Sequence, residues 1–405
     1  MEPLLQDDLQ ARYGWRLRLR AADDDQQKSR YKYPSRLLGR FCIPSSMSLS
    51  SVAVVVLVAA VLMAITPVYA VEEGKPFPVD VWEPPFNQQR QHVRREYVPL
   101  AHASKTWKVC GAIPHLKDDY WLAVNSALIQ ESRRLGVRLN VFEAGGYENV
   151  ETQKRQIADC VKDGANGLIL GAISADGLND LIGSYAARGI PVVDLINGVT
   201  SRAIAARAAA DFYDMGFAAG QSLKELTDAE GRAVRIAWFP GPKGAGWVAA
   251  GDQGLRDALK GTRIVIVDTS FGDTGIVEQT RLLNATLDRH RGLDYIVGTA
   301  VTAEAAVQVL RERNLSLRTK VISYYFSPGV YRGIQRGTIV VAPSDQPAVQ
   351  AKLSIDLAVR ILEKRDHLTH VSAPVLLVDR NNVNRFDVGS SLAPPGFRPI
   401  FSTTE

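Results

Sequence analysis

The chain has 405 residues, 46% of them apolar and 22% charged, an ordinary globular composition with enough apolar side chains for one or two cores. The first 46 residues hold nine Lys/Arg and six Asp/Glu, and so carry +3 of the formal net charge of +5. The remainder is near neutral and has no basic stripe with interleaved aromatic residues, which argues against a nucleic-acid-binding protein. The three cysteines, Cys42, Cys110 and Cys160, form no C-x-x-C pair, which argues against thiol redox and zinc-ribbon proteins.

An unbroken apolar run from Val52 to Ile65 indicates a secretory signal peptide. Its 14 residues fall short of the roughly 20 that a spanning helix needs. Pro67 follows, then Val-Tyr-Ala ending at Ala70, and Arg36 and Arg40 supply positive charge upstream. We therefore expect export to the periplasm with cleavage near Ala70; the alternative is a short membrane anchor.

The polar stretch before this run is long for a signal peptide. Residues 1–46 precede it, and Met47 offers another start, although the sequence that follows it lacks a basic region. We therefore treat residues 1–70 as an N-terminal extension and signal peptide with a doubtful start codon. Residues 71–104 are interpreted as a Pro-rich lead.

Strands and helices alternate regularly from residue 107 onward. Short apolar runs predict strands, and apolar residues at helical spacing predict helices. In the first half, strands are expected at Trp107–Ile113, Val137–Phe142, Gly167–Leu170 and Ile190–Leu195, and helices at Asp119–Leu135, Val150–Val161 and Ala175–Ala187.

The same alternation continues through the second half. Strands are expected at Val234–Phe239, Ile264–Val267, Tyr295–Val297, Lys320–Ser323 and Ile339–Ala342, and helices at Tyr213–Leu226, Ala245–Lys260, Gly275–Arg289, Ala303–Arg313, Pro328–Arg336 and Ala348–Lys364. Such alternation forms right-handed βαβ units around a parallel sheet. The sequence therefore predicts an α/β protein with two doubly wound parallel-sheet lobes.

Export changes the interpretation of two cysteines. Cys110 lies in the first predicted strand and Cys160 near the end of the second helix. Disulfides persist in oxidising compartments. We therefore expect a Cys110–Cys160 disulfide; the alternative is two buried free thiols.

Aromatic side chains gather in the loops after the predicted strands. Open parallel sheets bind ligands outside the carboxyl ends of their strands, where loops normally favour small polar residues. The aromatic residues found there instead are Tyr120, Trp121, Tyr147, Phe212, Tyr213, Trp247, Tyr324 and Tyr325. A single one would more often belong to a core, but with eight we expect at least four to line one cleft. Such a cage suits a cation or a methylated amine.

Polar groups in these loops are few. Asp345 directly follows a strand and either faces a ligand or caps the helix near Ala348. Asn197 either offers its amide to the ligand or belongs to a hinge turn. The glycine-rich stretch Gly241–Gly246 lacks a nucleotide fingerprint and is more typical of a close-packed turn.

Catalytic and metal-binding patterns are missing from the sequence. It has no G-x-S-x-G elbow and no H-E-x-x-H, and its closest histidine pair, His367 and His370, lies in a polar stretch. We therefore expect no enzyme, no metal and no cofactor.

Several stretches carry a resemblance to a known family. They are Lys117–Trp121 (KDDYW), Glu143–Tyr147 (EAGGY), Pro240–Pro242, Gly298–Ala300 with Ala303–Ala306, Ser323–Tyr325, Val330–Gly333, Ser344–Gln346 and Pro395–Pro399 (PGFRP). With these, the chain resembles the type I periplasmic binding proteins over about residues 105 to 401. Within them it looks like the trimethylamine N-oxide-binding partners of sensor histidine kinases.

The resemblance implies a site. Its amine-oxide cage carries over to Tyr120, Trp121, Tyr147, Tyr325 and Asp345. One family tryptophan corresponds to Phe212 here, which keeps a ring but removes an indole N–H, and Trp247 is the candidate to compensate. The choice between Tyr324 and Tyr325 as the residue facing the cleft stays open.

The type I topology also implies three crossings between the lobes, near Asn197–Ser201, Tyr325–Pro328 and Ala342–Asp345. That division gives an N-terminal lobe of residues 105–198 plus 326–342. The C-terminal lobe is then 199–325 plus 343–380, followed by a tail, 381–405.

We therefore expect a periplasmic protein that closes on trimethylamine N-oxide, or a similar small methylated amine, and regulates a sensor histidine kinase in two-component signalling. The alternative is the substrate-binding subunit of a sugar or polyol ABC transporter, which would need more hydrogen-bonding groups in these loops. A third class is an exported enzyme on the same fold.

Overall fold

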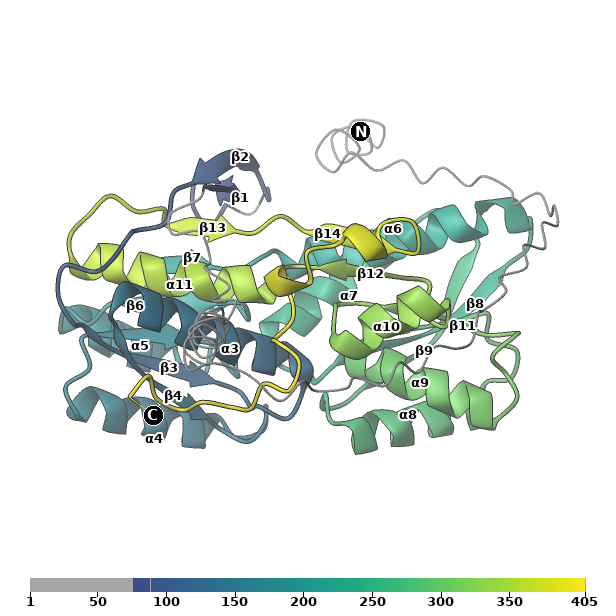
Figure 1. The fold of residues 1–405 in the computed structure, drawn as a ribbon. Helices are drawn as coiled ribbons and strands as arrows, with labels where there is room; N and C mark the ends of the chain where they lie inside the picture. Colours follow the sequence, from purple (N-terminus) through teal and green to yellow (C-terminus); the bar gives the residue numbers. More distant parts are fainter. Residues whose placement is uncertain (1–75, 88, 405) are drawn as a thin grey trace, which may run out of the picture. The chain divides into compact units, whose positions relative to one another are not determined.

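The computed structural model describes residues 76–87 and 89–404, which lie within one compact unit, residues 70–405 (Figure 1). Within those ranges no helix is both long and apolar enough to cross a membrane. The expected signal peptide, its cleavage site near Ala70, the alternative start at Met47 and Cys42 all lie outside the described residues.

The first lobe is built on an eight-stranded sheet with the order β2-β1-β13-β7-β6-β5-β3-β4. The strands are β1 (Phe77–Trp82), β2 (His92–Tyr97), β3 (Lys108–Ile113), β4 (Arg138–Glu143), β5 (Gly167–Leu170), β6 (Val192–Leu195), β7 (Ala206–Ala208) and β13 (His370–Ser372). The pairs from β13 to β4 are parallel, whereas β1 pairs antiparallel with both β13 and β2.

Helices cover both faces of this sheet. The helices are α3 (Asp119–Leu135), α4 (Val150–Lys162), α5 (Asn179–Ala187) and α11 (Pro347–Leu362). α3 packs against α11 on one face, and α4 and α5 lie over β3 and β6 on the other. Alternate residues of a strand therefore enter different cores: Val109 packs with the α3 side, and Cys110 with the α4 side.

The predicted disulfide is present and follows from this alternation. Cys110 points from β3 towards α4, where Cys160 lies in the last turn of the helix. The two residues are bonded across a Cα–Cα distance of 6.4 Å. The bond therefore joins β3, which lies between β5 and the edge strand β4, to the helix that covers it.

The interpretation of residues 71–104 as a lead before the first strand is wrong for its described part. β1 and β2 form a hairpin there, in register from Phe77↔Tyr97 to Trp82↔His92. β2 carries charged residues on both faces because it is an edge strand that is largely exposed, so it shows no period-two pattern.

The second lobe has a four-stranded parallel sheet with the order β11-β10-β8-β9. Its strands are β8 (Val234–Gly241), β9 (Ile264–Phe271), β10 (Tyr295–Gly298) and β11 (Lys320–Ser323), and its helices are α6 (Phe212–Thr227), α7 (Gly246–Leu259), α8 (Ile276–Arg289), α9 (Ala300–Glu312) and α10 (Pro328–Arg336). A short helix η1 (Asp228–Glu230) follows α6. α6 packs along α7, and α9 packs between α8 and α10.

A separate pair, β12 (Val341–Ser344) and β14 (Leu376–Asp379), runs antiparallel beside β11 and α6. The chain passes between the lobes at residues 209–211, 345–346 and 373–375. These are three crossings, as expected, and the second lies beside the predicted Ala342–Asp345 position.

The other two predicted crossings, near Asn197–Ser201 and Tyr325–Pro328, are wrong. Residues 326–342 belong to the second lobe, because α10 packs on α9. Residues 347–372 belong to the first lobe, because α11 packs on α3 and β13 pairs with β7. The error has a physical cause: β7 and β13 have three residues each, too few to show a period, and both join the first sheet only through long-range pairing.

The C-terminal tail returns to the first lobe. It passes through η2 (Val383–Arg385) beside α10 and η3 (Val388–Ser390) beside α11. Its end then covers the edge strand β4, where Val141 N donates to Phe401 O at 2.7 Å and Thr403 N donates to Leu139 O at 3.0 Å.

Candidate ligand-binding site

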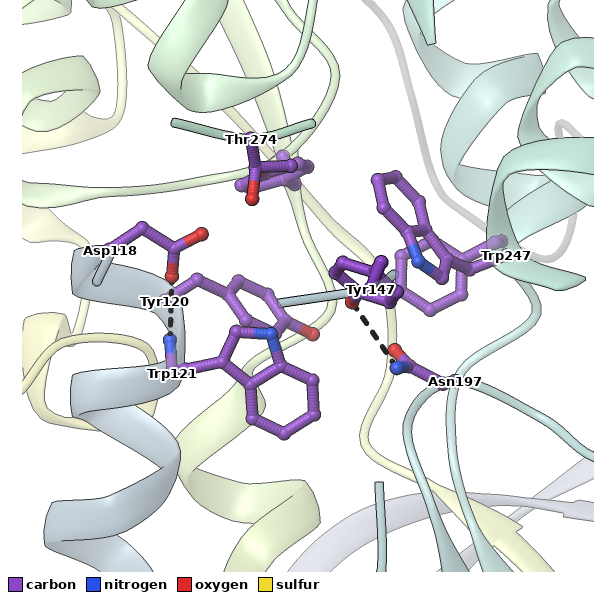
Figure 2. A pocket seen from close by; sticks show the side chains of 9 residues that line it. Asp118, Tyr120, Trp121, Tyr147, Asn197, Trp247 and Thr274 are labelled. Carbon is purple, nitrogen blue, oxygen red and sulfur yellow. Dashed lines mark hydrogen bonds between the residues drawn. The ribbon is translucent and has the colours of Figure 1, made fainter. Parts of the chain in front are cut away.

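One cavity is lined by residues from both lobes (Figure 2). Its lining is Asp118, Tyr120, Trp121, Tyr147, Asn197, Phe212, Trp247, Thr274 and Tyr325. These residues lie at the carboxyl ends of strands in both sheets, where open parallel sheets bind ligands. The cavity has a volume of about 20 Å³, enough for roughly one or two water molecules.

The start of α3 supplies one wall. Asp118 caps the helix by accepting from Trp121 N at 3.1 Å, and this fixes the first turn that carries Tyr120 and Trp121. Tyr120 donates its hydroxyl to Asp345 Oδ2 at 2.6 Å. Asp345 therefore lies behind Tyr120, outside the residues that line the cavity. Its side chain does not cap α11, whose N-cap is Gln346.

Hydrogen-bond donors converge around Tyr147. Asn197 Nδ2 donates to the Tyr147 hydroxyl at 3.2 Å and to Ala172 O at 2.8 Å. Burial raises the pKa of Tyr147, while the hydrogen bond from Asn197 to its oxygen lowers that pKa. Trp247 Nε1 is buried and has no hydrogen-bond partner among the described residues. The cavity thus presents the N–H group of Trp247 and the O–H group of Tyr147 on the side shown near these two residues (Figure 2).

The second lobe supplies the opposite wall. Phe212 is the first residue of α6 and lies 5.7 Å, between ring centroids, from Trp247 near the start of α7. Trp247 enters over Gly241, whose φ of +116° and missing Cβ allow the indole within 2.5 Å of where a Cβ would stand. Tyr325 meets Tyr120 edge-to-face at 5.3 Å.

The structure distinguishes the two neighbouring tyrosines. Tyr325 lines the cavity, whereas Tyr324 stacks behind Trp247 with an interplanar angle of 17°. The Tyr324 hydroxyl donates to Trp247 O at 3.2 Å. Tyr324 therefore supports the indole and has no place in the lining.

Charged and polar groups at the first-lobe end complete the site. Burial raises the pKa of Asp118 to about 6 and lowers the pKa of His115 to about 4. His115 Nε2 lies 3.3 Å from Thr274 Oγ1, across the two lobes. Beside them, Lys117 of the first lobe pairs with Asp273 of the second.

Seven of the eight predicted ligand-binding residues line this cavity: Tyr120, Trp121, Tyr147, Asn197, Phe212, Trp247 and Tyr325. The eighth, Asp345, touches it only through Tyr120. Asp118 and Thr274 are the additional residues. In the sequence, Asp118 is a carboxylate just after the first strand, but its position before a helix is equally typical of a helix cap. No sequence pattern indicated Thr274. No cluster of metal-ligating side chains occurs within residues 76–87 and 89–404.

Comparison with known proteins agrees with the fold and the position of the site. A family model described as a periplasmic binding protein domain matches residues 111–366. The chain belongs to the periplasmic binding protein family. This membership confirms the two-lobed α/β fold and the prediction that the protein is not an enzyme.

Within the periplasmic binding protein family the chain is TorT-like. It is 37% identical over 311 residues to the periplasmic protein TorT of Escherichia coli (strain K12), a match covering 77% of this chain and 89% of the relative. TorT in complex with the TorS sensor domain in the presence of TMAO is 32% identical, covers 73% of this chain and 99% of that chain, and superposes with a TM-score of 0.67. The same complex without ligand superposes with a TM-score of 0.66.

A further solved relative is an ABC transporter solute-binding protein from Bradyrhizobium sp. BTAi1 with bound bis-tris. It is 44% identical, covers 81% of this chain and 98% of that chain, and has a TM-score of 0.71. The family thus includes similar proteins named for sensing and for transport.

Proposed function

We propose that this protein is a periplasmic sensor component that closes on trimethylamine N-oxide, or on a similar small methylated amine oxide, and regulates a sensor histidine kinase. The observation that carries the proposal is the polarity of the cavity. The Trp247 N–H and the Tyr147 O–H lie at one end, the carboxyl group of Asp118 lies at the other, and aromatic rings lie between them.

An amine oxide matches this polarity. Its oxygen carries negative charge and accepts hydrogen bonds, and its methylated nitrogen carries positive charge, which aromatic faces and a carboxylate attract. Because Tyr147 already accepts from Asn197, its own proton is available to a ligand oxygen. The tight cavity favours a ligand of few heavy atoms over a hexose.

The proposed partner is supported by the TorT relative, which was solved with the TorS sensor domain in the presence and absence of TMAO. Export of this chain to the periplasm, with cleavage near Ala70, belongs to the same proposal and agrees with the relative named as a periplasmic protein.

Calorimetry on the purified protein with a pair of matched ligands tests the ligand. Trimethylamine N-oxide and tetramethylammonium share a methylated nitrogen, but only the first has an oxygen. We expect Tyr147→Phe to weaken binding of the N-oxide about tenfold, as expected for loss of one hydrogen bond in a buried site, and to leave tetramethylammonium binding within about twofold. Equal losses for both ligands, or no binding of the N-oxide to the wild type, would contradict the proposal.

A solute-binding subunit of an ABC transporter is the second candidate, favoured by the 44% identity to the Bradyrhizobium protein. Bis-tris is a hydroxylated tertiary amine, so this candidate shares the amine but not the signalling role. Co-purification with the periplasmic domain of a histidine kinase separates the two, because only the sensor role requires that complex.

A further inference from the structure

Described residues of the β1–β2 hairpin loop are joined by side-chain hydrogen bonds. Asn87 bridges the loop internally, since its Nδ2 donates to Pro84 O and to Gln91 O at 2.8 Å each and its Oδ1 accepts from Gln91 N at 2.8 Å. The ring of Phe86 stacks on His370 at 5.2 Å between centroids, which attaches the loop to β13 of the first lobe.

Two residues of this loop adopt left-handed backbone conformations that side chains other than glycine rarely occupy. They are Phe86, with φ of +58°, and Arg90, with φ of +54°. Such conformations persist where surrounding contacts impose them, and they concentrate at functional positions. The backbone conformation of Phe86 is explained by the stacking of its ring on His370 of the first lobe. The side chain of Arg90 instead extends to the second lobe.

Arg90 contacts the start of the second lobe at two points. Its Nε lies 2.9 Å from Asp211 Oδ2, and its guanidinium carbon lies 3.6 Å over the ring of Tyr213. Asp211 also caps α6 by accepting from Tyr213 N at 2.9 Å. The residue between these two contacts is Phe212, which lines the ligand cavity.

Phe212 is also a wall between two spaces. On one side is the ligand cavity, and on the other is an open cleft of about 560 Å³, bordered by the hairpin loop, with Phe212, Trp247 and Asn197 common to both linings. Movement of Phe212 would admit water from the cleft to the cavity and weaken the polar contacts made inside it.

We propose that Arg90 is a positioning residue for the ligand site: from the first lobe it holds Asp211 and Tyr213 of the second, and so fixes Phe212 as the seal between the cavity and the cleft. The hairpin is thereby a part of the ligand-binding apparatus. Ligand occupancy, which presses on Phe212, is coupled through Arg90 to the hairpin loop.

The first test needs no ligand. Hydrogen–deuterium exchange of peptides covering residues 209–218 is compared in the wild type, Arg90→Ala and Arg95→Ala. Arg95 is the matched control, because it pairs with Glu83 inside the same hairpin. We expect faster exchange at the start of α6 in Arg90→Ala only. Equal exchange in Arg90→Ala and Arg95→Ala overturns the proposal.

The second test uses trimethylamine N-oxide as the probe and rests on the proposed function. Arg90→Ala removes an ion pair of partly exposed groups and a cation–π contact, so we expect it to bind the probe about three- to tenfold more weakly. Binding should be unchanged in Arg95→Ala. It should be intermediate in Arg90→Lys, which keeps the charge but loses the planar stack. Wild-type affinity in Arg90→Ala overturns the proposal. Should the wild type itself fail to bind, the proposed function fails while the exchange measurement still decides the role of Arg90. Should Arg90→Ala unfold, Arg90→Lys decides in both measurements.

Discussion

Two buried carboxyl groups define the electrostatics of the site. Burial raises the pKa of both Asp118 and Asp345 to about 6. They have different surroundings: Asp118 lines the cavity, whereas Asp345 accepts from the Tyr120 hydroxyl behind it. Asp118 is therefore the group that a positive ligand nitrogen would meet.

The raised pKa of Asp118 predicts how affinity depends on pH. A ligand cation stabilises the carboxylate, so the pKa of Asp118 is lower in the complex than in the free protein, and binding below pH 6 releases a proton. Affinity is expected to rise from pH 5 through 6 and to level off near pH 7. The rise cannot exceed about tenfold per pH unit for one group. Calorimetry from pH 5 to 7.5 measures it.

Asp118→Asn should remove this slope and weaken binding at pH 7. His115 does not complicate the measurement, because burial lowers its pKa to about 4 and the ring stays neutral throughout the range. A slope that survives in the Asp118→Asn variant would contradict the assignment and indicate Asp345 instead.

The raised pKa of Asp118 affects the stability of the ligand-free fold in the opposite direction: ligand affinity rises with pH, whereas the stability falls. The folded pKa of about 6 lies above the ordinary value of 3.8, so the folded state holds a proton that the unfolded chain has released. The contribution of Asp118 to the free energy of unfolding is therefore fully present below about pH 4, and it is lost as the pH rises to about 6.

At the scale of elements, the close packing of α6 on α7 positions Phe212 and Trp247. Gly216 of α6 lies so near α7 that a Cβ would stand 2.1 Å from Gly251 O. A Cβ on Gly254 of α7 would likewise stand 2.0 Å from Tyr213 O. The two helices that begin at the cavity are thus held together by glycine contacts.

Gly216→Ala is therefore expected to destabilise the protein although alanine favours helices. Helix propensity alone would add about 1 kcal/mol, but a backbone clash of this kind costs about 1–3 kcal/mol or more. The matched control is Gly183→Ala in α5, where no atom lies within 4 Å of the new Cβ. Thermal unfolding should show a lower Tm for the first variant and an unchanged or higher Tm for the second; the same direction in both would contradict this account.

Elements with local signals were predictable from the sequence. α3 matches its predicted bounds because Asp118 caps its start and Gly136, with φ of +76°, ends it. The hairpin strands β1 and β2 were missed, and so were β7 and β13. Their stability comes from neighbouring strands rather than from a periodic pattern of their own.

At the scale of the whole molecule, an ion pair joins the two lobes next to the cavity-lining residues Asp118 and Thr274. Lys117 pairs with Asp273, with side chains 33% and 29% exposed. We expect such contacts to favour this arrangement over one with the lobes apart, and so to raise the apparent affinity for a ligand held between the lobes.

Lys117→Ala is expected to weaken ligand binding about two- to fivefold at low salt, the size typical of a partly exposed ion pair. The difference from the wild type should shrink at about 0.5 M salt because screening weakens the pair. Lys154→Ala, which removes an ion pair to Glu151 within α4 of the first lobe, is the control. An equal loss in Lys154→Ala, or a loss independent of salt, would contradict the role of Lys117.

The sequence by itself determined the alternation of strands and helices, the two α/β halves and the aromatic residues after the strands, because apolar periodicity and loop composition are local properties. Tertiary structure decided which segments join which lobe, since strands of three residues such as β7 and β13 are specified by their partners. It also decided that Tyr325 rather than Tyr324 lines the cavity and that Asp345 lies behind Tyr120. Side-chain direction at a strand end depends on packing from helices distant in sequence, and no local pattern records it.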